Sequence, residues 1–113
     1  MKNKRGASRH NIMQFLSVTD ESGNEVIGNV LDISESGMRV ISELNSYAVG
    51  PHKNIIIEVL LDDGETENYI ILAQAIWIKL DNDPGFCQIG FRFLKLPDDS
   101  NEFLQFIINN DKQ

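Results

Sequence analysis

The feature that most constrains the fold of this chain is a succession of short β-type runs separated by turn-forming residues. Each run is rich in β-branched and aromatic residues, and clusters of Asp, Asn, Ser, Gly and Pro stand between successive runs. The predicted strands are residues 13–19, 25–33, 38–42, 54–61, 69–80 and 86–93. Short strands at such spacing are typical of an all-β barrel or sandwich.

The last two predicted strands indicate which side chains enter the core. Alternation with a period of two places one apolar set on a single face of the last strand, namely Cys87, Ile89, Phe91 and Phe93. Both faces of strand 69–80 are apolar, with Ala73, Ala75 and Trp77 on one face and Leu72, Ile76 and Ile78 on the other. A strand that is apolar on both faces indicates a barrel wall that is also covered from outside. We expect Trp77 and the phenylalanines to belong to the core.

The C-terminal segment supplies a candidate for that cover. Asp99-Ser100-Asn101-Glu102 has the spacing of an N-terminal capping box and stands directly before an apolar run. Phe103, Phe106 and Ile107 then fall on one helical face. The sequence predicts a helix over 99–109 that packs on the barrel.

Composition and charge narrow the functional class. At 113 residues the chain is one domain, and its net charge of −7 and pI of about 4.6 disfavour a general DNA- or RNA-binding protein. Cys87 is the only cysteine, and the two histidines lie far from it, so neither a disulfide nor a metal site is expected. No apolar run approaches the roughly 20 residues of a membrane helix, and the basic start has no apolar stretch behind it. We expect a cytoplasmic protein without a cofactor or membrane insertion.

The charge is nevertheless unevenly distributed along the chain. Residues 1–10 carry four of the ten basic side chains and no acidic one, whereas all 17 acidic side chains follow later. A basic arm on an acidic body suits a small anionic ligand or an acidic protein patch better than long DNA. We therefore divide the chain into a flexible basic arm over 1–12 and a barrel with its C-terminal helix over 13–113. A basic terminus can also be a solvated tail without a function.

Two short motifs occur in this setting. The first is Arg5-Gly-Ala-Ser-Arg9 in the basic arm, and the second is Asp32-Ile-Ser-Glu-Ser-Gly37 at the end of one predicted strand and the following turn. Together, and in this order, they resemble the RxxxR and [D/N]xSxxG signatures of the PilZ family. The segments 73–77, which ends in tryptophan, and 88–93, with a G-x-x-F pattern, resemble two further strands of that family. The resemblance runs from Arg5 to about Leu96 and implies a split β-barrel of about six antiparallel strands with a nearby α-helix.

The same resemblance implies a receptor for the bacterial second messenger cyclic di-GMP. In this reading Arg5 and Arg9 clamp the ligand, because a guanidinium pairs bidentately with phosphate or with the O6/N7 edge of guanine. The other residues implied as ligand-binding are Lys4, Asp32, Ser34, Gly37 and Arg39. Asp32 complements the N1–H and N2–H₂ donors of guanine, and Ser34 bonds a base edge or phosphate or shapes the turn.

The remaining residues have roles of their own in this interpretation. Gly37 provides a backbone conformation or a close approach that a Cβ would forbid. Arg39 adds positive potential, and Lys4 stands where a basic residue in this family accompanies binding of a stacked ligand pair. Ligand binding would order the arm and create a surface for a protein effector, with pilus, flagellar or exopolysaccharide machinery as family-level candidates.

Two alternatives remain open at the level of the sequence. Asp, Ser and Gly are common turn formers, so residues 32–37 could form a hairpin turn and nothing more. The chain could also be a PilZ-like protein-interaction domain that binds no nucleotide, although such members usually lose one of the two motifs. An enzyme is not expected, because no nucleophile–base set and no phosphate-cradling glycine loop is present in the sequence.

Overall fold

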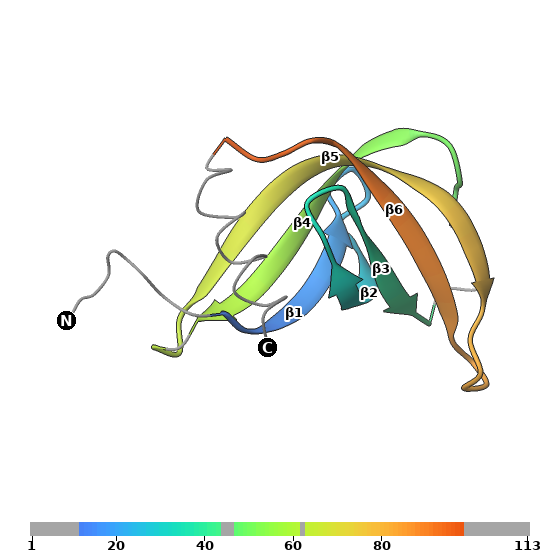
Figure 1. Ribbon diagram of the computed structural model, residues 1–113, viewed down its shortest axis with the longest axis horizontal. Helices are drawn as coiled ribbons and strands as arrows, with labels where there is room; N and C mark the ends of the chain where they lie inside the picture. The colour runs from blue at the N-terminus through green and yellow to red at the C-terminus, as the bar shows by residue number, and fades with distance from the viewer. Residues whose placement is uncertain (1–11, 44–46, 62, 99–113) are drawn as a thin grey trace.

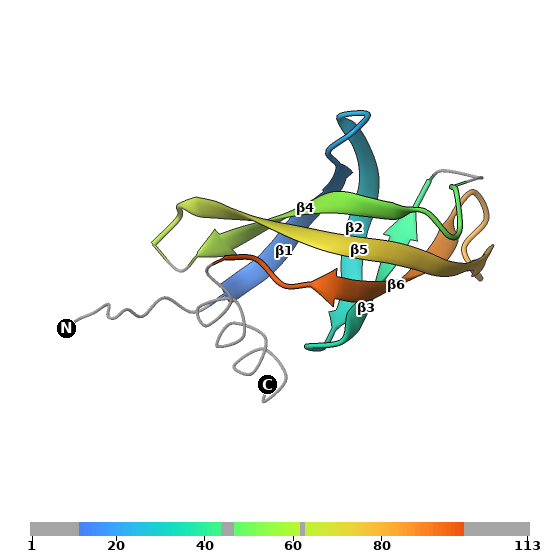
Figure 2. The same cartoon turned by 90° about the horizontal axis from the view of Figure 1, so that it is seen from above.

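Six antiparallel strands form a closed barrel in the computed structural model, which describes residues 12–43, 47–61 and 63–98. The strands are β1 (Ile12–Asp20), β2 (Glu25–Ile33), β3 (Gly37–Ser42), β4 (His52–Leu61), β5 (Thr66–Leu80) and β6 (Cys87–Lys95). Their order around the barrel is β1-β2-β3-β6-β5-β4, and the pairing of β1 with β4 closes it. Figures 1 and 2 show β5 running the length of the molecule between β4 and β6.

The predicted strands are confirmed in number and place. The bounds of β2 coincide with the prediction, and the other strands differ from it by at most three residues at either end. Turn chemistry sets the ends, as the β1–β2 hairpin shows. There the carboxylate of Asp20 accepts hydrogen bonds from the backbone N–H and hydroxyl of Ser22 at 3.0 and 2.7 Å, and Asn24 adopts a left-handed φ of 51°. The predicted helix over 99–109 lies outside the described residues.

Alternation of side chains fills the interior of the barrel. The core comprises Val18, Ile27, Ile33, Met38, Val40, Ile55, Ile57, Val59, Leu61, Tyr69, Ile71, Ala73, Ala75, Cys87, Ile89 and Phe91. The predicted inward face of β6 is confirmed, with Phe93 half-buried against this core. Burial of so much aliphatic surface is the main force that holds the barrel together. Within the described residues there is no helix long and apolar enough to span a membrane.

Trp77 departs from its predicted place, and the cause is a β-bulge. Ala75 pairs with Phe91, but Trp77 pairs with Gly90, so Ile76 is an extra residue in β5. An extra residue reverses the facing of every later side chain in the strand. Ile78 therefore turns toward the core, and Trp77 turns to the outside, where it is half-buried. The prediction that Trp77 shares a face with Ala75 and belongs to the core is wrong.

A buried carboxylate links β1, β4 and the β3–β4 loop by hydrogen bonds at one end of the barrel. Asp20 is only 2% exposed, and its Oδ2 accepts hydrogen bonds from the Tyr47 hydroxyl at 2.7 Å and the Lys53 ammonium at 3.0 Å. Burial by itself raises the pKa of Asp20, but the hydrogen bonds from Tyr47, Ser22 and Lys53 outweigh it and lower the pKa to about 2. The Tyr47 ring in turn packs edge-on against Phe91, with the ring centroids 5.8 Å apart.

Candidate functional site

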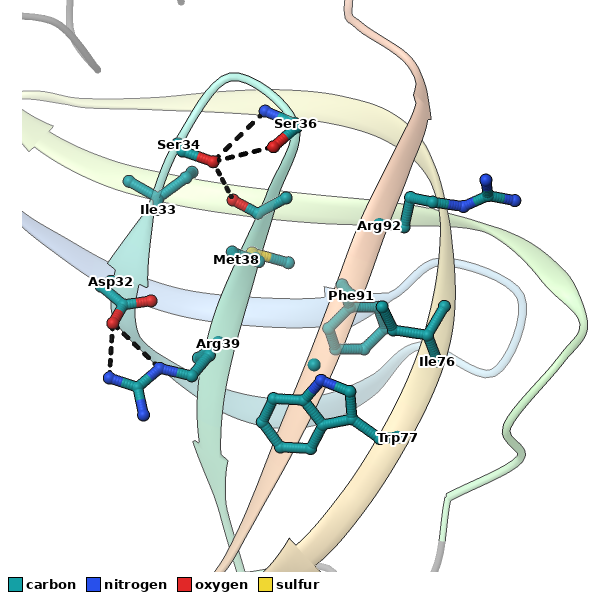
Figure 3. Close-up of a pocket in the computed structure, with 12 residues that line it drawn as sticks. Asp32, Ile33, Ser34, Ser36, Met38, Arg39, Ile76, Trp77, Phe91 and Arg92 are labelled. Carbon is teal, nitrogen blue, oxygen red and sulfur yellow. Dashed lines mark hydrogen bonds and ion pairs between the residues drawn. The ribbon is translucent and has the colours of Figure 1, made fainter.

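Most residues of the second sequence motif line an open pocket on the outer wall of the barrel. Its volume is about 490 Å³, within the range of roughly 300–1,000 Å³ typical of small-molecule sites. It is lined by Asp32, Ile33, Ser34, Ser36, Gly37, Met38, Arg39, Ile76, Trp77, Gly90, Phe91 and Arg92. Four of the seven residues predicted to bind ligand are in this set (Figure 3). The other three, Lys4, Arg5 and Arg9, lie outside the described residues.

Two glycines of the pocket lie on adjacent strands at positions where a β-carbon would collide with a neighbour. Gly37 opens β3 opposite Arg92 of β6, and Gly90 of β6 lies opposite Arg39. A β-carbon built on Gly37 would lie 2.3 Å from the carbonyl oxygen of Phe91, far inside van der Waals contact. Of the two roles predicted for Gly37, the structure therefore shows close approach to the neighbouring strand, and its φ is not positive.

Asp32 and Arg39 form an ion pair at one side of the pocket. Nε and Nη2 of Arg39 both donate to Oδ2 of Asp32, at 2.9 and 2.5 Å, and Figure 3 shows the two side chains pointing toward each other. The pair is exposed to solvent, with 45% of the Arg39 side chain and 55% of the Asp32 side chain accessible. Hydrogen bonding to Asp32 raises the pKa of the Arg39 guanidinium above its ordinary value. A carboxylate and a guanidinium thus lie side by side, both reachable from solvent.

The turn between β2 and β3 is held by the hydroxyl of Ser34. Its Oγ lies 3.2 Å from the Ser36 hydroxyl and accepts a hydrogen bond from the Ser36 N–H at 3.3 Å, while the Ser34 N–H donates to the Gly37 carbonyl at 2.8 Å. The N–H of Phe93 donates to the carbonyl of Ser36 at 2.9 Å, which ties this turn to β6. Both serine side chains remain exposed. The turn therefore presents two hydroxyls to the solvent from a fixed backbone.

Trp77 and Ile76 form an apolar side of the pocket that the sequence interpretation missed. The indole extends from β5 across β6 (Figure 3). Its ring fills the space beside Gly90, where a β-carbon would collide with it. Ile76, the bulged residue, is 47% exposed beside it. The glycine within an apolar strand was the available signal, because such a residue often marks the close approach of another group. Nothing in the alternation of β5 distinguishes Trp77 from its neighbours.

Arg92 is the second cationic residue of the pocket and was also missed. It lies at the opposite side of β6 from Arg39 in Figure 3, and its Nη2 donates to Oε1 of Gln74 at 2.9 Å. The pocket therefore holds two guanidinium groups and one carboxylate, although the whole chain carries a net charge of −7. This local excess of positive charge favours an anionic ligand.

The family model for the PilZ domain matches residues 3–109, which is nearly the whole chain. No curated protein and no solved structure matches the chain. The match covers both motifs and all six strands of the barrel. This chain belongs to the PilZ domain family.

Proposed function

We propose that this protein is a cyclic di-GMP receptor that binds its ligand at the pocket around Asp32 and Arg39 and signals to a partner protein. PilZ domains are binding and adaptor domains, and the family is one of cyclic di-GMP receptors. The observation that carries the proposal is that Asp32, Ser34, Gly37 and Arg39 line one open pocket with excess positive charge on an otherwise acidic barrel.

The chemistry of the pocket matches that of the ligand. The carboxylate of Asp32 complements the N1–H and N2–H₂ donors of guanine, and a guanidinium such as Arg39 matches its O6/N7 edge or a phosphate. The exposed Ile76 and the half-buried Trp77 offer an apolar surface beside these polar groups. Aromatic faces bind nucleobases by stacking, and this tolerates either guanine of the ligand.

The N-terminal arm supplies the remaining residues of the proposed site, and these are assigned from the sequence alone. Arg5 and Arg9 would close over the phosphates and bases of the ligand, as the family resemblance implies. Closure would order the basic arm that precedes β1 against the barrel and so change the surface that a protein effector meets. Lys4 extends the basic arm and would favour a stacked pair of ligand molecules.

Calorimetric titration of the purified chain with cyclic di-GMP tests the proposal, with GTP and cyclic GMP as comparison ligands. We expect cyclic di-GMP to bind and the two comparison ligands not to bind. Arg5→Ala and Arg9→Ala should each lose about 2–5 kcal/mol of the binding free energy. Lys2→Ala is the matched control, because it removes one positive charge from the same arm without touching the motif. No heat with the wild-type chain at high micromolar ligand would contradict the proposal and favour a protein-interaction domain that binds no nucleotide.

A further inference from the structure

Arg39 is held by a second partner besides Asp32. While Nε and Nη2 bond to Asp32, Nη1 donates to Oε1 of Gln88 at 3.2 Å. Asp32 lies on β2, Arg39 on β3 and Gln88 on β6, so the guanidinium joins three strands on the outer wall. One arginine at the side of the pocket is therefore fixed from two directions.

Asp81 determines which end of the Gln88 amide faces Arg39. Nε2 of Gln88 donates to Oδ1 of Asp81 at 2.6 Å, and a carboxylate can only accept hydrogen bonds. The amide nitrogen must therefore point to Asp81, which leaves the amide oxygen for Arg39. This bond lowers the pKa of Asp81, and the β5–β6 turn holds the same carboxylate through the N–H of Asp83 at 3.0 Å. A chain of hydrogen bonds runs from the turn through Gln88 to Arg39 and Asp32.

Binding of a guanine to Asp32 would disturb one end of this chain. Two N–H groups of Arg39 already bond to Oδ2 of Asp32, whereas a guanine that presents N1–H and N2–H₂ needs both carboxylate oxygens. The base and the guanidinium therefore compete for Oδ2. Without its bonds to Asp32, the exposed Arg39 side chain would sample several rotamers unless another hydrogen bond holds it in place.

We propose that Gln88, oriented by Asp81, is a positioning residue of the ligand site that retains Arg39 beside the pocket when the ligand takes over Asp32. This inference rests on the proposed function, since it concerns how the same pocket holds cyclic di-GMP. Gln88 acts through Arg39: it keeps the guanidinium available for the base edge or the phosphate. Neither Gln88 nor Asp81 lines the pocket.

A double-mutant cycle in cyclic di-GMP affinity separates this role from a merely structural one. We expect Arg39→Met to weaken binding about tenfold or more, and Gln88→Leu to weaken it about fivefold. In the Arg39→Met background, Gln88→Leu should have no further effect, because Gln88 then has no guanidinium to hold. Asp81→Asn should weaken binding about twofold, since an asparagine retains a carbonyl acceptor for Gln88.

Gln74→Leu is the matched control. It removes the other glutamine–arginine hydrogen bond of the same outer wall, the one to Arg92, and should leave the cycle with Arg39→Met additive. Unchanged thermal unfolding of each variant would show that the barrel is intact.

The outcomes separate the two proposals. A wild-type chain that binds while Gln88→Leu and Asp81→Asn bind equally well would overturn the positioning role and leave the receptor function standing. Additive effects of Arg39→Met and Gln88→Leu, or tighter binding by Arg39→Met, would overturn it as well. Failure of the wild-type chain to bind would instead contradict the receptor function itself.

Discussion

The indole of Trp77 occupies the space that a side chain at residue 90 would fill. A β-carbon built on Gly90 would lie 2.2 Å from Cε2 and 2.3 Å from Nε1 of Trp77. The ring and the missing side chain are thus complementary across the β5–β6 pair, on the outer face of the barrel. This relationship creates the apolar side of the pocket.

Replacement of Gly90 by alanine should displace the indole and reshape the pocket. We expect a loss of about 1–3 kcal/mol in the free energy of unfolding from this overpacking, and weaker binding of cyclic di-GMP. Urea denaturation followed by the fluorescence of Trp77, the only tryptophan of the chain, measures both the stability and the environment of the ring. Gly23→Ala is the control, because the nearest atom to its β-carbon would be 3.9 Å away. Equal spectra and stabilities for the two variants would contradict the arrangement.

Substitution of Gly37 should separate effects on stability from effects on the site. The β-carbon of Gly37→Ala would collide with the backbone oxygen of Phe91 at 2.3 Å, and that of Gly28→Ala with the backbone oxygen of Ile41 at 1.9 Å. Both variants should lose about 1–3 kcal/mol of stability or more, because strand backbones yield little. Of these two glycines, Gly37 lines the site pocket and Gly28 does not. At a temperature where both are folded, Gly28→Ala should bind cyclic di-GMP like the wild type and Gly37→Ala should not.

The charge of Asp32 should matter for affinity. An asparagine offers one acceptor and one donor where guanine presents two donors, so Asp32→Asn should weaken cyclic di-GMP binding about 10- to 100-fold. Asp63→Asn is the matched control, since Asp63 is an exposed carboxylate in the β4–β5 turn whose Oδ1 accepts the N–H of Glu65. Calorimetric titrations that return the same affinity for both variants would remove Asp32 from the site.

Acid should destabilise the barrel through Asp20. Its pKa of about 2 in the folded chain lies below the ordinary value of 3.8, so the ionised carboxylate stabilises the fold. This contribution is fully present above about pH 5 and is lost as the pH falls through 4 toward 2, a change of about 2 kcal/mol.

Urea unfolding at pH 7 and at pH 3 measures this dependence. Asp20→Asn should be less stable than the wild type at pH 7. Its free energy of unfolding should also change much less between pH 7 and pH 3 than that of the wild type. Tyr47→Phe, which removes one donor to Asp20, should reduce that difference only in part. A wild-type chain with equal stability at both pH values would contradict the assignment.

The sequence by itself determined the strands and the motif. Turn clusters such as residues 20–24 and the alternation in β6 depend on neighbouring residues alone, so local patterns were enough to place the six strands. The motif at 32–37 is likewise local, and the structure puts its Asp, Ser and Gly at one pocket. The role of Arg5 and Arg9 stays a prediction.

Only the tertiary structure decided what surrounds that motif. The bulge at Ile76 turns Trp77 outward over Gly90. The alternation pattern could not predict this bulge, because both faces of β5 are apolar. The hydrogen bond that links Arg39 to Gln88 joins residues 49 positions apart, and it exists because β3 pairs with β6, its neighbour in the barrel but not in the sequence. Strand register is a global property, whereas turn and alternation signals are local. For this reason the side of the pocket formed by Ile76, Trp77 and Arg92 could not be predicted from the sequence.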